Sequence, residues 1–189
     1  MKIVLVNGPP RSGKDTAQSA VDGSIHLKLS QPVKEGAHTS FGLPLDLYPA
    51  DYFEGSKDMP SDLFFGKTPR QVYISCSEDF VKKISEDTKV FGKILCNKIK
   101  NRSWAEDDVF IITDSGFEGE AESIVEEFGR DNVVLIRVHR EGFTFEGDSR
   151  GYIYLDRLGV ESFDVLNRGI EKYKEDIRKI IKGDQEESV

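Results

Sequence analysis

The chain has 189 residues, of which 38% are hydrophobic and 32% charged, and its formal net charge is −8. This length and composition predict one globular domain over 1–189 with a core of its own, and the acidic balance argues against a general surface for binding nucleic acid. No apolar stretch reaches the roughly 20 residues that a membrane helix needs, and the N-terminus leads directly into a strand rather than a signal sequence, so we expect a cytoplasmic protein without a membrane partner.

Five apolar runs rich in β-branched residues recur along the chain and predict strands. They are KIVLV at 2–6, IHLKL at 25–29, VFIIT at 109–113, VVLIRV at 133–138 and FDVL at 163–166. Continuous apolar strands alternating with helical patterns are what a parallel sheet covered on both faces requires. We therefore predict a three-layer α/β fold, with a five-stranded, mostly parallel sheet and helices on both faces.

Helices are predicted between these strands from their start and stop signals. The first begins at Lys14, directly after a glycine-rich turn, and ends near Asp22-Gly23. Another is marked by Thr68 as its cap and by the proline that follows it. The helices predicted after the first span 32–41, 68–84, which is the one that Thr68 caps, 87–101, 118–129 and about 168–182. Residues 183–189, GDQEESV, are expected to form a frayed polar tail.

Two segments match no regular pattern. Residues 43–67 hold three prolines and many aromatic side chains, and residues 141–157 have the sequence EGFTFEGDSRGYIYLDR. Irregular segments of this length inside a compact domain are usually functional. We expect an acceptor-side insertion over about 43–70 and a lid over about 141–157.

The sequence GPPRSGKDT follows the first strand, opens a helix and has the spacing of a phosphate-binding loop. In such a loop, backbone N–H groups point at phosphate oxygens, and the lysine reaches the β- and γ-phosphates. The loop is predicted to bind a nucleoside triphosphate such as ATP, because the alternative, a glycine turn with an incidental lysine, does not explain position, flanks and spacing together. The residues expected to contact the nucleotide are Gly8, Arg11, Ser12, Gly13, Lys14, Asp15 and Thr16, with Arg140 from the flank of the second insertion, directly before residue 141.

Asp15 stands where such a loop ordinarily carries the hydroxyl that reaches magnesium. In one interpretation its carboxylate holds Mg²⁺ directly or through water, with Thr16 nearby. In the other, Asp15 is only an anionic residue favoured in the first turn of a helix. Asp114 ends a buried strand, where it would hold the water of the metal or position the acceptor, unless it is a plain turn aspartate. The predicted metal ligands are Asp15, Thr16 and Asp114.

Phosphoryl transfer requires positive charge around the migrating group, which makes the arginines of the irregular segments candidates. They lie in the loop, at the start of the helix after the first insertion, and around the second insertion: Arg11, Arg70, Arg137, Arg140 and Arg150. A lid that carries arginine would supply charge and exclude water, whereas the alternative is ordinary surface arginine. The predicted catalytic residues are Lys14, Asp114, Arg70 and Arg150.

The sequence GPPRSGKDTA resembles the loop of bacteriophage deoxynucleoside monophosphate kinases, in which an aspartate also follows the lysine. Later segments resemble the same family in the same order, namely LSQPVKEGAHTSFG, TPRQVYISCSEDFVKK, DSGFEGEAESIVEEFGRDNVVLIRVHREG and FDVLNRGIEKYKEDIRKII. The resemblance spans most of the chain, and its loop motif is the specific part. It implies a P-loop kinase fold, ATP and Mg²⁺ as cofactors, and the host cytoplasm if the protein is viral.

The chain departs from the free-nucleotide kinases at two places. Their third strand ends in Asp-x-Arg, whereas this chain continues as Asp114-Ser115-Gly116, and Cys76-Ser77-Glu78 stands where they carry Gly-Thr-Glu. Paired arginines hold an acceptor phosphate dianion, and one expected arginine is missing here. The short length and the DSGF and GDSRGYI sequences look more like a related phage branch of the thymidylate kinase-like family, which phosphorylates 5-hydroxymethyluracil already built into DNA during thymidine hypermodification.

Two acceptors follow: the hydroxymethyl group of 5-hydroxymethyluracil in phage DNA, ranked first, and a free deoxynucleoside monophosphate. The acidic net charge counts against DNA, and a base acceptor must also leave the stack. Aromatic residues of the first insertion would stack on such a base or form a small core of their own: Tyr48, Tyr52, Phe53, Phe64 and Phe65. A further hypothesis is an ATPase or nucleotide switch without kinase activity, and the sequence leaves the oligomeric state open.

Overall fold

A computed structural model describes residues 1–183, so the tail that was expected to fray lies outside the described residues, apart from Gly183. Its centre is a five-stranded sheet in the order β2-β3-β1-β4-β5. Every neighbouring pair is parallel. The strands are β1 (Lys2–Asn7), β2 (Ile25–Leu27), β3 (Val109–Ile112), β4 (Val133–His139) and β5 (Glu161–Leu166). The α/β class and the parallel sheet are as predicted.

Strand β1 lies at the centre, paired on one side with β3 and on the other with β4. Leu5 is in register with both Ile112 and Leu135, so these three strands end at the same edge of the sheet. The chain leaves β1 towards β2 and later crosses over to β4, which makes the loop after β1 the point where the strand order reverses. Ligands of open α/β sheets bind outside the carboxyl ends of the strands at such a point.

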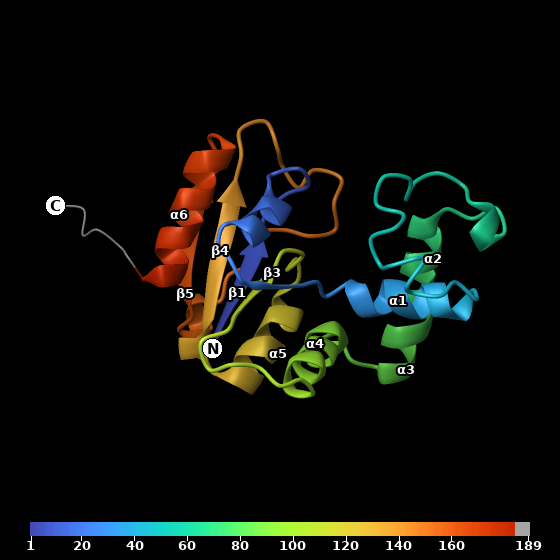
Figure 1. Ribbon diagram of the computed structural model, residues 1–189, viewed down its shortest axis with the longest axis horizontal. Coiled ribbons are helices and arrows are strands. Elements are labelled where there is room, and N and C mark those ends of the chain that lie inside the picture. Colours follow the sequence, from blue (N-terminus) through green and yellow to red (C-terminus); the bar gives the residue numbers. More distant parts are fainter. Residues whose placement is uncertain (184–189) are drawn as a thin grey trace.

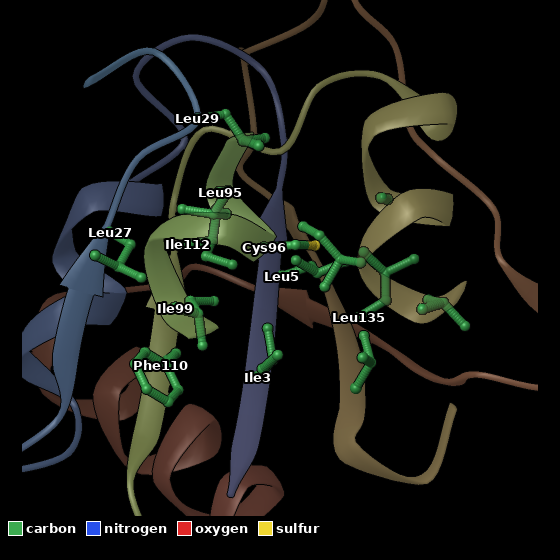
Figure 2. Close-up of a cluster of buried hydrophobic side chains, with 14 of the residues drawn as sticks. Ile3, Leu5, Leu27, Leu29, Leu95, Cys96, Ile99, Phe110, Ile112 and Leu135 are labelled. Atoms are coloured by element: carbon green, nitrogen blue, oxygen red, sulfur yellow. The ribbon is translucent and has the colours of Figure 1, made fainter. Parts of the chain in front are cut away.

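Alternate residues of the strands enter two separate hydrophobic clusters. Ile3 and Leu5 pack with residues of α4 (Val90–Lys100) and α5 (Glu118–Phe128), as Figure 2 shows for the β1, β3 and β4 side chains. On the other face, the second cluster joins the sheet to η1 (Lys14–Ser19) and α6 (Ile170–Lys182). Helices therefore cover both faces, which is why the central strands are almost continuously apolar.

A helical lobe lies beside the sheet (Figure 1). It consists of α1 (Gln31–Ser40), the first insertion with the short helix η2 (Asp62–Phe64), and α2 (Pro69–Ser75), which continues into η3 (Cys76–Lys82) and α3 (Lys83–Ser85). The lobe has a cluster of its own, formed by Ala37, Leu43, Phe53, Phe64 and Val72. Of the two roles considered for the aromatics of the insertion, Phe53 and Phe64 have the core role, whereas Phe65 is 85% exposed.

Buried His38 joins the insertion to two helices of the lobe. Its Nδ1 lies 2.8 Å from the Tyr48 carbonyl oxygen and its Nε2 lies 2.7 Å from the Tyr73 hydroxyl. The ring also contacts Phe53 edge-on, at 5.4 Å between centroids. The first insertion is therefore a packed part of the lobe and not a free loop.

Two predicted helices differ from the observed ones. The helix expected from Lys14 to near Gly23 is only the 3₁₀ helix η1, which ends at Ser19. Hydroxyl groups of Ser19 and Ser24 bond to nearby backbone carbonyls, and such bonds compete with a longer α-helix. The helix predicted over 68–84 is continuous over Pro69–Ser85, but its middle section, Cys76–Lys82, is π-helical.

The second insertion returns across the carboxyl edge of the sheet (Figure 1). Among the described residues, the only regular element of this insertion is the short helix η5 (Asp156–Leu158), at its end. Another short helix, η4 (Arg130–Asn132), lies outside the insertion, directly before β4. Ile153 and Leu155 are buried in the same cluster as α4 and α5, which anchors the far end of this segment. Within residues 1–183, no helix has the length and apolar character to cross a membrane.

Candidate active site

The loop after β1 owes its shape to two residues with positive φ. Arg11 has a φ of 63° and Gly13 a φ of 101°, which is the left-handed region that glycine tolerates. A Cβ on Gly13 would lie 2.4 Å from Nδ2 of Asn167, and this amide donates a 2.8 Å hydrogen bond to the Ser12 carbonyl oxygen. Gly13 is therefore required both for its φ and for the close approach of Asn167.

Strand β4 and the segment directly after it contact the loop. A Cβ on Gly8 would lie 2.7 Å from the Val138 carbonyl oxygen, so the loop lies directly on β4. Nη1 of Arg140 donates a 3.0 Å hydrogen bond to the Arg11 carbonyl oxygen. The hydroxyl of Ser12 is buried without a hydrogen-bond partner in residues 1–183. Arg140 thus lies against the loop, and its observed contact is with the loop backbone.

Consecutive backbone amides at the end of the loop are free to bind a ligand. Within the described chain, the N–H groups of Gly13, Lys14 and Asp15 donate no hydrogen bond, whereas the next amide, of Thr16, bonds to the Gly13 carbonyl at 3.0 Å. Successive amides around a left-handed residue form a concavity that binds anions. Because η1 is a short 3₁₀ helix, the expected contribution of a helix dipole is small, and these amides with Lys14 provide the positive potential.

Lys14 lies at the centre of this concavity. Its Nζ donates a 2.7 Å hydrogen bond to the Pro9 carbonyl oxygen, so the side chain folds over the loop. Burial, together with the positive charge of the nearby Arg150 guanidinium, lowers the pKa of Lys14 to about 8. A polyanion at the loop would favour the charged ammonium and raise this pKa again.

Asp15 points towards the end of β3. Its Oδ1 accepts a 2.9 Å hydrogen bond from the Thr113 hydroxyl and lies 3.4 Å from Nζ of Lys28. The side chain is 70% exposed, and its second oxygen has no partner in the described chain. Asp15 and the neighbouring Thr16 thus offer a free carboxylate oxygen and a hydroxyl beside the anion concavity, which is the donor set that Mg²⁺ prefers.

Asp114 is already occupied by three hydrogen bonds. Its Oδ1 accepts from the Leu29 amide at 2.8 Å, and its Oδ2 accepts from the amide and hydroxyl of Ser30 at 2.9 and 2.8 Å. These bonds join the end of β3 to the turn that starts α1. The observed contacts of Asp114 position this turn, and the residue also lines the neighbouring cavity.

A cavity of about 310 Å³ lies between the lobe and the carboxyl edge of the sheet. Its walls come from the start of α1, from the insertion near 50–57, from α2 and η3, and from the turn after β3. The lobe, the sheet edge and the second insertion each contribute one predicted residue to it: Arg70, Asp114 and Arg150. A cavity of this size, with aromatic and charged walls, is typical of a small-ligand site.

Arg70 begins α2, which is capped by Thr68 and Gln71 in a reciprocal capping box. Its guanidinium makes a two-point contact with Asp58, through a short bond from Nε and a 3.1 Å bond from Nη2. This pairing raises the pKa of Arg70 and holds the side chain against the cavity from the lobe side.

Arg150 comes from the second insertion and lies against the turn after β3. Asp148 holds its guanidinium with bonds of 2.9 and 2.6 Å, and these bonds lower the pKa of Asp148 to about 2. A Cβ on Gly116 would lie 2.4 Å from Cδ of Arg150. Gly116 therefore leaves the space through which Arg150 reaches the cavity.

Arg137 does not join the site. It is buried beside β5 and makes a two-point ion pair with Asp164, with bonds of 3.0 and 2.7 Å. Its guanidinium also lies 4.8 Å from the centre of the Tyr154 ring. The arginines around the second insertion thus divide into a structural one, Arg137, and two that reach the loop or the cavity, Arg140 and Arg150.

Sequence analysis missed three residues that build the site. Buried Asn7 donates to the carbonyl oxygens of Ser115 and Gly151 at 2.8 and 3.1 Å, and so fixes the second insertion to the turn after β3. Asn167 holds the loop from the end of β5. Glu120 is a buried carboxyl in the cavity wall. The sequence signal for Asn7 is a polar residue at the end of an apolar strand. The signal for Glu120 is its spacing from Ile124, which puts both residues on the same face of the helix.

Two further observations bear on identity. The part of the chain that the structure describes contains no group of three or more His, Cys, Asp or Glu residues that could hold a metal ion by itself. Magnesium at nucleotide sites needs only one or two protein ligands, because phosphate and water supply the others. A comparison with protein-family models and with curated proteins finds no match for this chain.

Proposed function

We propose that the protein is an ATP- and magnesium-dependent P-loop kinase whose acceptor is a pyrimidine deoxynucleotide or its base. One observation carries the proposal. Arg150 lines the cavity and also lies close enough to Lys14 to lower the pKa of that lysine. An anion concavity and a ligand-sized cavity therefore share one cation, as the transfer of a phosphoryl group between two bound substrates requires.

The loop side would hold the triphosphate. The free amides of Gly13, Lys14 and Asp15 and the Lys14 ammonium suit the β- and γ-phosphates. Magnesium bound by Asp15 and Thr16 would neutralise charge on these phosphates, and the unpartnered oxygen of Asp15 fits that role. Arg150 would face the migrating group from the acceptor side.

The cavity supports an acceptor that carries a base. Phe117 is 42% exposed at the cavity wall, and the ring can stack on a base that enters from solvent. The basic residues of the wall are Lys34, Lys57, Lys82, Arg70 and Arg150, against the acidic Glu54, Glu78, Asp114 and Glu120. Basic and acidic residues of the wall are nearly equal in number although the chain as a whole is acidic, so a negatively charged acceptor meets less repulsion in the cavity than the net charge of the chain suggests.

We place 5-hydroxymethyluracil in phage DNA first among the acceptors. The acceptor there is an alcohol, and the base must leave the duplex to enter a cavity of this kind. A free deoxynucleoside monophosphate is the second candidate, because Arg70 and Arg150 both line the cavity and paired arginines suit an acceptor phosphate.

Transfer of labelled phosphate tests the proposal. The protein is incubated with ATP labelled in the γ-phosphate, together with hydroxymethyluracil-containing DNA or with single deoxynucleoside monophosphates. Label on the DNA supports the first acceptor, and label on one monophosphate supports the second. Release of inorganic phosphate with no labelled acceptor would instead indicate an ATPase or nucleotide switch.

A further inference from the structure

Glu120 is a buried carboxyl with no partner. The residue is 5% exposed and lines the cavity. In residues 1–183, its side-chain oxygens take part in no hydrogen bond or ion pair, although its backbone carbonyl accepts from the Ser123 hydroxyl at 2.8 Å. Buried carboxyl groups are ordinarily paired, because removing an unpaired one from water is unfavourable.

The position of Glu120 in its helix does not explain its burial. Acidic residues are favoured in the first turn of a helix such as α5. Glu118, in the same turn, satisfies that preference from the surface, where its Oε1 accepts the Tyr154 amide at 3.1 Å. A second acid on the buried face places an unpartnered carboxyl at the wall of a cavity, where a ligand can hydrogen-bond to it.

Glu120 shares the cavity wall with aromatic as well as charged side chains. Phe91 and Phe117 line the same cavity, and Nζ of Lys82 lies 5.9 and 5.6 Å from the centres of their rings. These residues come from η3, α4 and the turn before α5. Arg70 and Arg150 come instead from α2 and the second insertion, and Arg150 acts on Lys14. The cavity thus combines these aromatic residues and the Glu120 carboxyl with two arginines, of which Arg150 also lies near the phosphate loop.

The charge state of Glu120 suits a ligand edge with one donor and one acceptor. Its pKa is raised to about 7, chiefly by burial and then by the negative charge of Asp114, while Lys82 opposes the shift and Glu78 adds a smaller increase. A neutral carboxyl donates one hydrogen bond and accepts another. The imide edge of a uracil-type base offers the complementary pair, an N3–H donor beside a carbonyl oxygen, whereas the two neighbouring N–H donors of guanine do not.

We propose that the Glu120 carboxyl binds the imide edge of the acceptor base, which stacks against Phe117 with its reactive group towards Arg150. The inference rests on the proposed kinase function for the identity of the ligand as an acceptor. It goes beyond that function because it names a residue that selects uracil-type bases over guanine.

Direct binding tests this role without requiring phosphoryl transfer. The probes are dTMP, 5-hydroxymethyl-dUMP, dGMP and N3-methyl-dTMP, titrated by calorimetry in the presence of a non-hydrolysable ATP analogue. We expect Glu120→Leu to bind dTMP and 5-hydroxymethyl-dUMP roughly tenfold to hundredfold more weakly than the wild type does, as the loss of a buried hydrogen-bonded pair implies. Glu120→Gln, which keeps one donor and one acceptor, should bind them as the wild type does.

The methylated probe isolates the contact. N3-methyl-dTMP should bind the wild type about as weakly as dTMP binds Glu120→Leu, and Glu120→Leu should not distinguish the two nucleotides. Glu127→Leu is the matched control, because Glu127 lies on the exposed side of α5 and makes only an exposed ion pair with Lys100 at 2.8 Å.

Three results would overturn the inference: equal affinity of the wild type and Glu120→Leu for dTMP, an equal penalty for N3-methylation in both proteins, or tighter binding of dGMP than of either pyrimidine probe. Failure of every probe to bind the wild type would overturn it as well. Binding that depends on Glu120 but leads to no transfer of labelled phosphate would contradict the kinase function and still support the base-binding role.

Discussion

The protonation state of Lys14 should change when a triphosphate binds to the loop. Its pKa of about 8 means that the free protein holds this lysine only partly protonated at mildly alkaline pH. A triphosphate favours the charged form, so binding must be accompanied by proton uptake. The effect is specific to a lysine that is buried and close to Arg150, and an exposed surface lysine would not show it.

We predict that ATP binding at pH 8 takes up about half a proton from solution. The measurement is calorimetry in buffers that differ in ionisation enthalpy. Lys14→Met should abolish the uptake and weaken ATP binding at least about tenfold, because a buried charge-assisted contact is lost. Lys172→Met is the control, since Lys172 lies on the exposed surface of α6 and its ion pairs within residues 1–183 are with Glu175 and Asp176. Proton uptake that persists in Lys14→Met would assign it to another group.

Gly116 decides whether Arg150 reaches the cavity. We predict that Gly116→Ala displaces Arg150, because the added Cβ would lie 2.4 Å from Cδ of that side chain. The rate of phosphoryl transfer should fall by about tenfold to hundredfold, with little change in ATP affinity. Steady-state kinetics with varied ATP and varied acceptor separates these effects.

Gly119→Ala provides the matched control for Gly116→Ala. A Cβ on Gly119 would make an ordinary contact of 3.4 Å with Lys89, and alanine is the better helix former in α5. This variant should be as active as the wild type and slightly more stable. An unchanged rate in Gly116→Ala would show that Arg150 does not act in transfer.

At the scale of elements, Asp114 joins β3 to the turn between β2 and α1. We predict that Asp114→Asn lowers the free energy of unfolding by about 1–3 kcal/mol, because one carboxylate oxygen is replaced by an N–H donor that faces another donor. Activity should fall to the same extent with DNA and with monophosphate acceptors, as a positioning role implies. Chemical denaturation and the two transfer assays provide the measurements.

Asp131→Asn is the comparison for this variant. Asp131 is 94% exposed and lies 3.6 Å from Arg130, so its loss should not change stability measurably. A selective loss of transfer to the alcohol acceptor in Asp114→Asn, with stability retained, would contradict the positioning role and indicate a general base.

The strands could be predicted because local pattern determines them. Apolar runs such as 2–6 and 133–138 need only continuous burial to be recognised, and all five form the expected sheet. The helix after Lys14 was predicted too long, because side-chain hydroxyl bonds to the backbone oppose the glycine and lysine signals. The π-helical section Cys76–Lys82 has no distinct sequence pattern, since it differs from an α-helix by one residue in a turn.

The candidate site was only partly predictable for a different reason. A loop motif is contiguous in sequence, so the candidate residues around Lys14 could be named from their spacing alone. The cavity is assembled from segments far apart in the chain, and its pairings, such as Arg150 with Gly116, depend on the tertiary structure. Glu120 was missed because a glutamate in a first helical turn is ordinarily a surface residue.

At the scale of the whole molecule, Glu120 should make the free energy of unfolding depend on pH. Its pKa of about 7 in the folded state exceeds the ordinary value of 4.5, so the folded protein keeps the proton that the unfolded chain loses between these values. Stability from this group is complete below pH 4.5 and decreases as the pH rises to about 7, by on the order of 3 kcal/mol. Glu120→Gln should lack this decrease.

Urea denaturation of the wild type and Glu120→Gln at several pH values measures the difference. Comparing the two proteins removes the contributions of Asp148 and Asp164, whose pKa values of about 2 act in the opposite sense at more acidic pH. Parallel pH profiles for both proteins would contradict the burial and unpaired state of Glu120.

The proposed acceptor is a single base or nucleotide, which a cavity of about 310 Å³ between the lobe and the sheet can accommodate. The most direct test is transfer of labelled γ-phosphate from ATP to hydroxymethyluracil-containing DNA, with thymine-containing DNA of the same sequence and a panel of deoxynucleoside monophosphates in parallel. The account predicts label on a pyrimidine acceptor, on the hydroxymethyluracil DNA before any other, and none with Lys14→Met. No label on any acceptor, with the protein folded and ATP bound, would contradict it.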